Sequence, residues 1–216
     1  MTCTQERSKL KVALVNIFTS LRILLFPIIF ILISSGGIIN IVVALILFVL
    51  GALTDAFDGM IVRKYNLQTK FGFILDPIAD KFLVLGTLLA ISLVDYLMIP
   101  LYFFFIILFR DVLVSILKPI SDRNGFPIPT TFFAKLKTTI QFVSIISILV
   151  YMLVINFIFK ELSKESILSN LGLLGLIPYY TMLLMVLVTI ISGIDYIVLF
   201  VKGFLRSVKV SRTDER

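Results

Sequence analysis

Residues 41–81 read IVVALILFVLGALTDAFDGMIVRKYNLQTKFGFILDPIADK, an apolar sequence that contains four aspartates: Asp55, Asp58, Asp76 and Asp80. An ionised carboxylate at membrane depth costs at least about 2.5 kcal/mol, so four of them in one short stretch require a compensating cation. Residues three or four apart on a helix share one face, which pairs Asp55 with Asp58 and Asp76 with Asp80. A short loop between two such helices would bring the pairs together, which predicts a divalent-metal site.

The composition of the whole chain is typical of a membrane protein. Of its 216 residues, 59% are hydrophobic and 15% are charged, and the mean hydropathy is +1.10. A soluble domain has about 25% charged residues. The single cysteine, Cys3, excludes an internal disulfide and a cysteine metal site, and the lack of histidine excludes His-based catalysis and a His-ligated zinc. Carboxylates must therefore carry out any proton transfer.

Apolar segments of the chain recur at the length of a membrane-spanning helix, about 20 residues. We predict an all-α integral membrane protein with six transmembrane helices at residues 21–34, 38–62, 71–94, 99–117, 132–159 and 173–201. Residues 8–18 have an apolar side and are predicted to form a short amphipathic helix in the membrane interface, not a cleavable signal peptide. The predicted organisation is an N-terminal cytoplasmic segment (1–20), a six-span domain (21–203) and a basic cytoplasmic tail (204–216).

The distribution of basic residues predicts the orientation in the membrane. Lys and Arg gather in residues 7–11, 63–70, 118–137 and 202–216, whereas residues 36–40 and 95–100 contain none. By the positive-inside rule both termini are cytoplasmic, and so is the end of the second and third spans where the aspartates lie. The net charge of +7 fits attraction to anionic lipid head groups. A nucleic-acid partner is not expected, because no soluble basic domain is present.

Residues next to the aspartates indicate a ligand that carries phosphate groups. Gly59 follows Asp58, and Gly72 opens the third span, so a ligand can approach the backbone at both places. Arg63 would border the predicted metal site with positive charge that suits phosphate oxygens, and Thr69 lies in the turn that follows. Oxygen ligands beside cationic residues suit Mg²⁺ or Mn²⁺ bridging a diphosphate.

Two other interpretations of the aspartates compete with a metal site. A single intramembrane aspartate often serves only to hydrogen-bond neighbouring helices, but four at this spacing with Gly and Arg argue against a purely structural role. A divalent-cation or proton-coupled membrane carrier is the stronger competitor, because ionisable residues in spans also mark ion pathways. Against a carrier, the carboxylates gather at one end and form no relay, and no broken-helix pattern repeats between the two halves.

The sequence also resembles a known family at these residues. Residues 54–63 (TDAFDGMIVR) and 72–81 (GFILDPIADK) look like the signature of the CDP-alcohol phosphatidyltransferases. That signature is Asp-x-x-Asp-Gly-x-x-Ala-Arg, eight residues, then Gly-x-x-x-Asp-x-x-x-Asp. Val62 stands where the family usually has Ala, which concerns the local packing and not the chemistry.

The resemblance implies a six-span fold, usually a homodimer, and a role for each matching residue. Two metal ions, Mg²⁺ or Mn²⁺, would be bound by Asp55, Asp58, Asp76 and Asp80. Asp80 would in addition be the catalytic general base. The cytidine diphosphate part of a CDP-diacylglycerol donor would be held by Gly59, Arg63, Thr69 and Gly72. Asn16, Thr19 and Arg22 would line the same pocket from the first helix, or only cap that helix where it enters the membrane.

Segments outside the signature are most similar to the phosphatidylglycerophosphate synthase branch of the family. They are residues 16–22 (NIFTSLR), 110–115 (RDVLVS), 135–141 (KLKTTIQ, with Ala134 replacing the usual Gly) and 192–196 (SGIDY). This branch implies phosphatidyl transfer from CDP-diacylglycerol to sn-glycerol 3-phosphate, with release of CMP, in a bacterial inner membrane. The runner-up within the family is a cardiolipin synthase that uses phosphatidylglycerol as the acceptor.

A candidate binding site for the acceptor's phosphate lies in the second half of the chain. Arg110 interrupts an apolar run, and an arginine at membrane depth needs an anion. With Lys135 and Lys137 at the head of the fifth span, it would form a phosphate clamp. The alternative is that Arg110 pairs with Asp111 or a signature aspartate, and that the two lysines only extend to the interface.

Overall fold

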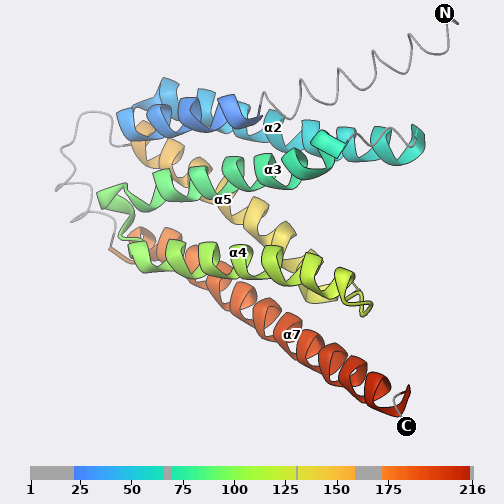
Figure 1. Ribbon diagram of the computed structural model, residues 1–216. Helices are drawn as coiled ribbons and strands as arrows, with labels where there is room; N and C mark the ends of the chain where they lie inside the picture. The colour runs from blue at the N-terminus through green and yellow to red at the C-terminus, as the bar shows by residue number, and fades with distance from the viewer. Residues whose placement is uncertain (1–21, 66–69, 130, 159–171, 215–216) are drawn as a thin grey trace, which may run out of the picture. The chain divides into compact units, whose positions relative to one another are not determined.

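The computed structural model describes residues 22–65, 70–129, 131–158 and 172–214, and their side chains over 22–54, 81–129, 131–158 and 172–206. This part of the chain is helical and contains no strand (Figure 1). The all-α prediction is therefore confirmed. The helices are Arg22–Ser35, α2 (Ile38–Tyr65), α3 (Lys70–Ser92), α4 (Leu101–Arg123), α5 (Phe132–Ile158) and α7 (Ile177–Asp214), with short 3-10 helices η1 (Asp95–Leu97) and η2 (Gly172–Leu176).

Each of the six predicted spans lies on one of these long helices, but not all are apolar over a full membrane thickness. Among the described residues, Phe132–Ile158 and Gly172–Arg206 are long and apolar enough to cross a membrane. The apolar helical segments Arg22–Ser35, Ile38–Thr54 and Lys81–Ser92 are shorter. The two long apolar helices suggest membrane association, and the six-span arrangement stays a prediction.

Helix α4 exposes an apolar stripe and buries a charged residue. Its exposed positions Phe105, Phe109, Val112 and Ile116 recur every three or four residues and form one apolar stripe. Its buried positions include the charged Asp111. A surface helix in water places apolar residues inward and charges outward. The outward apolar stripe fits a helix whose outer face contacts lipid.

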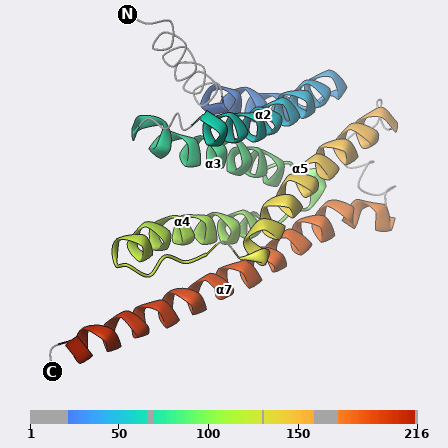
Figure 2. The same cartoon turned by 90° about the vertical axis from the view of Figure 1, so that its right-hand side faces the viewer.

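The chain divides into two compact units, of which the first comprises Met1–Tyr96 and Ile145–Gly172. In this unit α3 runs antiparallel to α2 and lies beside it, as Figures 1 and 2 show. At Gly51 of α2, a Cβ atom would lie 2.8 Å from Leu83 of α3 and 3.5 Å from Leu25 of the Arg22–Ser35 helix. The missing side chain therefore lets three helices approach one another closely at this level.

The second unit comprises Leu97–Ser144 and Leu173–Arg216, and its central feature is the contact between α4 and α7. Residues near the beginning of α4 contact the beginning of α7, and residues further along the chain from α4 contact later parts of α7, so the two helices run parallel. The rings of Phe103 and Tyr179 lie 5.6 Å apart near the beginnings of the two helices. Beyond the end of α4, the rings of Phe126 and Phe200 lie 5.5 Å apart. This packing positions the charged middle of α4 against α7.

Candidate active site

Both pairs of signature aspartates lie within regular helix, so their sequence spacing is a helical spacing. Asp55 and Asp58 belong to α2, and Asp76 and Asp80 belong to α3, although their side chains lie outside the described residues. On a helix, positions i, i+4 and i+7 follow one face. Residues 51, 55 and 58 of α2 have this relation, and so do residues 76, 80 and 83 of α3.

The contact between Gly51 and Leu83 therefore relates the positions of the aspartates on α2 to those on α3. Since α2 and α3 are antiparallel, moving from Gly51 towards Asp55 and from Leu83 towards Asp80 proceeds the same way along the helix pair. All four aspartates occupy register positions that continue the stripe on which the two helices meet. This register supports the predicted metal site, which itself stays a prediction.

The residues predicted to bind the donor are described only in part. Gly59 and Arg63 lie in α2, and Gly72 lies in α3, where the backbone is helical and the side chains are outside the described residues. Asn16, Thr19 and Thr69 lie outside the described residues altogether. Their predicted roles in binding cytidine diphosphate therefore remain predictions.

Arg22 is a buried cation at the start of the first described helix. Its side chain is only 1% exposed. It lies three residues before Leu25, which meets Gly51, so the two residues share one face of their helix. A buried arginine is tolerated only with anionic or hydrogen-bonding partners. Together with Asn16 and Thr19, Arg22 is predicted from the sequence either to line the nucleotide pocket or only to cap the helix that enters the membrane, and this role stays a prediction.

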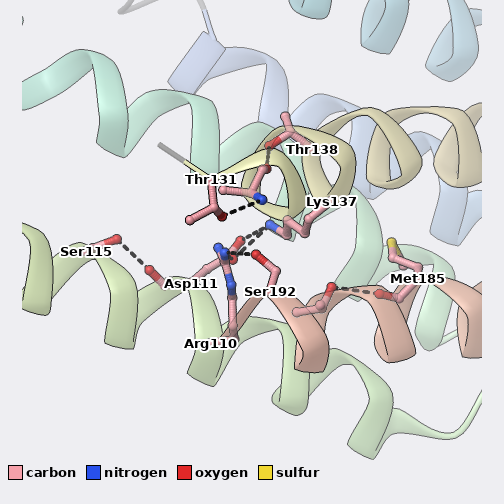
Figure 3. A network of polar contacts seen from close by, with 10 residues as sticks. Arg110, Asp111, Ser115, Thr131, Lys137, Thr138, Met185 and Ser192 are labelled. Atoms are coloured by element: carbon pink, nitrogen blue, oxygen red, sulfur yellow. Dashed lines mark hydrogen bonds and ion pairs between the residues drawn. The ribbon is translucent and has the colours of Figure 1, made fainter. Parts of the chain in front are cut away.

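The second unit contains a buried ionic cluster, shown in Figure 3, that joins α4, α5 and α7. Lys137 donates from Nζ to both carboxylate oxygens of Asp111, at 2.8 and 2.7 Å. Arg110 donates from Nη1 to Asp111 Oδ1 at 3.2 Å and from Nη2 to Ser192 Oγ at 2.5 Å. The side chains of Arg110, Asp111 and Lys137 are 12%, 7% and 6% exposed.

This cluster gathers two buried cations. Within the described residues, Arg110 and Lys137 both form an ion pair with the carboxylate of Asp111. Charges withdrawn from water cost several kcal/mol each unless they are paired and hydrogen-bonded. The Nε atom of Arg110 is buried and has no hydrogen-bond partner within the described part of the chain. Two cations at one buried place, and a donor of Arg110 without a partner among the described residues, fit a binding site for an anion.

The predicted three-residue clamp is assembled only in part. The structure brings Arg110 and Lys137 together, but it leaves Lys135 exposed. Residues two apart on a helix do not share a face, so Lys135 and Lys137 cannot both face Asp111 from α5. The pairing of Arg110 with Asp111, weighed as an alternative to the clamp, is present together with the contact to Lys137. The phosphate-binding role of all three cations stays a prediction.

Comparison with known proteins decides the family. The model of the CDP-alcohol phosphatidyltransferase family matches residues 12–191. The chain belongs to the CDP-alcohol phosphatidyltransferase family. It is therefore an enzyme of the transferase class, as the signature between Asp55 and Asp80 predicted.

Several relatives of this phosphatidyltransferase have names that specify the acceptor. This chain is 32% identical over 187 residues to a probable phosphatidylglycerophosphate synthase of Mycobacterium tuberculosis. The matched region covers 85% of this chain and 79% of that protein. This chain is also 37% identical over 169 residues to a CDP-diacylglycerol–glycerol-3-phosphate 3-phosphatidyltransferase of Rickettsia bellii, covering 77% and 91%. A Bacillus subtilis protein with the same name is 34% identical over 121 residues, covering 55% and 62%.

Members of this family generally use divalent metal ions. The residues of this phosphatidyltransferase fit such ions by the chemistry of the donor set. The four aspartates offer only oxygen ligands, which are the ligands that hard divalent cations prefer. By helical spacing, Asp55 and Asp58 share a face with Gly51 of α2, and Asp76 and Asp80 share a face with Leu83 of α3.

Sequence reasoning missed two functional candidates in this phosphatidyltransferase, Ser192 and Gly193. Ser192 accepts the hydrogen bond from Arg110, and a Cβ atom at Gly193 would lie 3.1 Å from Arg110 Cγ. The available signal was a Ser-Gly pair within an apolar span. That pair was noted as typical of one branch of the family, but nothing in the sequence connects α7 with Arg110, 82 residues earlier.

Proposed function

We propose that this protein transfers the phosphatidyl group of CDP-diacylglycerol to sn-glycerol 3-phosphate, giving phosphatidylglycerophosphate and CMP. The observation that carries the choice of acceptor is the buried cluster in which Arg110 and Lys137 both contact the carboxylate of Asp111. Such a site suits a phosphorylated acceptor and offers little to a neutral alcohol. The names of the relatives from Rickettsia bellii and Bacillus subtilis support the same acceptor.

The signature residues would bind the donor. Two Mg²⁺ or Mn²⁺ ions, held by Asp55, Asp58, Asp76 and Asp80, would neutralise the diphosphate and make CMP a better leaving group. The cytidine diphosphate part would be held by Asn16, Thr19, Gly59, Arg63, Thr69 and Gly72. The helical register of the aspartates on α2 and α3 supports this assignment.

The proposed chemical step is a substitution at phosphorus. The acceptor hydroxyl loses its proton to the carboxylate of Asp80, and its oxygen forms a new bond to the phosphorus that carries the diacylglycerol. The bond from that phosphorus to the bridging oxygen of the diphosphate breaks, and CMP leaves with the electron pair. Arg110 and Lys137 orient the acceptor through its own phosphate, and holding both reactants in place supplies much of the rate.

The enzyme would work as an integral membrane protein of the bacterial inner membrane. The proposal includes the six-span domain over residues 21–203 between the N-terminal segment and the basic tail. It places the termini and the active site on the cytoplasmic side, where CDP-diacylglycerol in the membrane meets a water-soluble acceptor. Charge asymmetry of the loops supports this orientation. A homodimer is expected from the family resemblance.

Release of CMP by the purified protein tests the proposed reaction. Protein in mixed micelles with CDP-diacylglycerol and Mg²⁺ is expected to release CMP only when glycerol 3-phosphate is added. Removing the metal with EDTA is expected to abolish this release, and adding Mg²⁺ or Mn²⁺ back is expected to restore it. Failure to release CMP with any alcohol acceptor would contradict the proposed function.

A further inference from the structure

We infer that Asp111 and Ser192 are positioning residues that hold Arg110 and Lys137 in one phosphate-binding arrangement, and that Gly193 makes room for it. The inference rests on the proposed function, since it concerns the binding of the acceptor. It adds α7 to the acceptor site, although the sequence pattern placed that site only on the fourth and fifth spans. Figure 3 shows the three helices around the cluster.

Asp111 holds the lysine. The ammonium group of a lysine sits on a flexible four-carbon chain, so a free lysine has no fixed position. Here both oxygens of Asp111 accept hydrogen bonds from Lys137 Nζ, and both side chains are less than a tenth exposed. The carboxylate thus ties α5 to α4 and holds the Lys137 charge next to the Arg110 guanidinium. It also lowers the cost of keeping two cations together out of water.

Ser192 holds the arginine. Its hydroxyl oxygen accepts a hydrogen bond from Arg110 Nη2, and the Ser192 side chain is buried. Next to it, Gly193 leaves the space that the aliphatic chain of Arg110 needs, because a Cβ atom there would come within 3.1 Å of Arg110 Cγ. The Ser-Gly pair of α7 therefore acts on Arg110 in two ways, through a hydrogen bond to its tip and through free space along its chain.

The contacts with Asp111 and Ser192 leave part of the Arg110 guanidinium free for a ligand. A guanidinium has five N–H donors. Within the described residues, the hydrogen bonds from Arg110 use one donor on Nη1 and one on Nη2, and the buried Nε has no partner. Arginine binds a phosphate through parallel hydrogen bonds in a fixed plane, so the orientation of that plane decides the affinity. Asp111 and Ser192 set this orientation without using all of the donors.

The Ser192→Ala variant tests the inference through steady-state kinetics. Losing one hydrogen bond to a charged group is expected to raise the KM for glycerol 3-phosphate about three- to tenfold. The KM for CDP-diacylglycerol and the kcat at saturating acceptor are expected to stay within about twofold of the original values. Inorganic phosphate is expected to inhibit competitively against glycerol 3-phosphate, and its inhibition constant should rise by the same factor as the acceptor KM.

Thr189→Val is the matched control in the same helix. Thr189 is fully buried and donates its hydroxyl to Met185 O of its own helix, so this substitution also deletes one buried hydroxyl from α7. The acceptor KM of this variant is expected to stay unchanged. An equal rise in both variants would mean that the effect comes from a general disturbance of α7, and the inference would be wrong.

A second variant, Gly193→Ala, tests the space along Arg110 and keeps every hydrogen-bonding group. Alanine favours the helical conformation over glycine, so the variant should fold. The added Cβ must push Arg110 aside by a few tenths of an ångström, which is expected to raise the acceptor KM about two- to fivefold. If neither Ser192→Ala nor Gly193→Ala changes this KM in an enzyme that uses glycerol 3-phosphate, the inference fails while the proposed function stands. If the unmodified enzyme does not use glycerol 3-phosphate, the proposed function itself fails.

Discussion

At the scale of single residues, the proposed chemistry depends on one carboxylate. Asp80 is the last aspartate of the signature, and its role as the proton acceptor rests on the resemblance to the family. Its place in α3 follows from described residues, because Leu83 contacts α2 three residues further along the same helix. A carboxylate that also binds metal is a weak base, so its contribution depends on its position.

The Asp80→Asn variant separates catalysis from folding. Its kcat is expected to fall about 10²- to 10⁴-fold, because the acceptor hydroxyl loses its general base. Binding of CDP-diacylglycerol, measured with a labelled donor, is expected to remain. Asp95→Asn removes an exposed aspartate in η1 and serves as the control, with unchanged kcat. Full activity of Asp80→Asn would show that the general-base assignment is wrong.

At the scale of helices, most of the fold could be predicted from the apolar runs, and the ends of helices could not. The fourth run was predicted to end at residue 117, whereas α4 continues to Arg123. The last run was predicted to end at residue 201, whereas α7 continues to Asp214. Hydropathy reports the apolar part of a helix, and polar residues that continue the same helix carry no such signal.

The ionic cluster shows the corresponding limit for the site. That Arg110 needs an anion followed from its apolar surroundings. That Lys137, and not Lys135, meets Asp111 depends on how α5 is rotated against α4, which only the structure provides. The aspartate signature was readable from sequence alone because its spacing is local to two consecutive helices.

Close packing of α2 against α3 at Gly51 predicts a variant that disturbs the metal site from one turn away. Gly51→Val would place side-chain atoms where Leu83 already lies 2.8 Å from a Cβ position, and would force the helices apart. The Mg²⁺ concentration for half-maximal activity is expected to rise severalfold, because both aspartate pairs continue this stripe. Adding Leu83→Ala is expected to restore part of the metal affinity. An unchanged Mg²⁺ dependence in folded Gly51→Val would contradict the proposed register.

At the scale of the whole molecule, the proposed function requires a fixed orientation in the membrane. The basic residues of the tail predict a cytoplasmic C-terminus, and the segment around Asp95 is predicted to face the other side. The outward apolar stripe on α4 and the two long apolar helices agree with a lipid environment.

Labelling of single cysteines tests this orientation. Once Cys3 has been replaced by Ser, the chain contains no other cysteine, so one can be introduced at a chosen place. Asp95→Cys is expected to react with a membrane-impermeant thiol reagent in intact bacterial spheroplasts. Thr213→Cys is expected to react only after the membrane is permeabilised. The opposite pattern of labelling would mean that the protein is inserted with inverted topology.

The most direct test of the central claim is competition between acceptors. Purified protein with CDP-diacylglycerol and Mg²⁺ would be offered labelled glycerol 3-phosphate together with phosphatidylglycerol, inositol phosphate or serine, and the lipid product would be identified by mass spectrometry. The proposed function predicts labelled phosphatidylglycerophosphate and one CMP per molecule formed, with little effect of the competitors. Cardiolipin as the product, with no label incorporated from glycerol 3-phosphate, would contradict it.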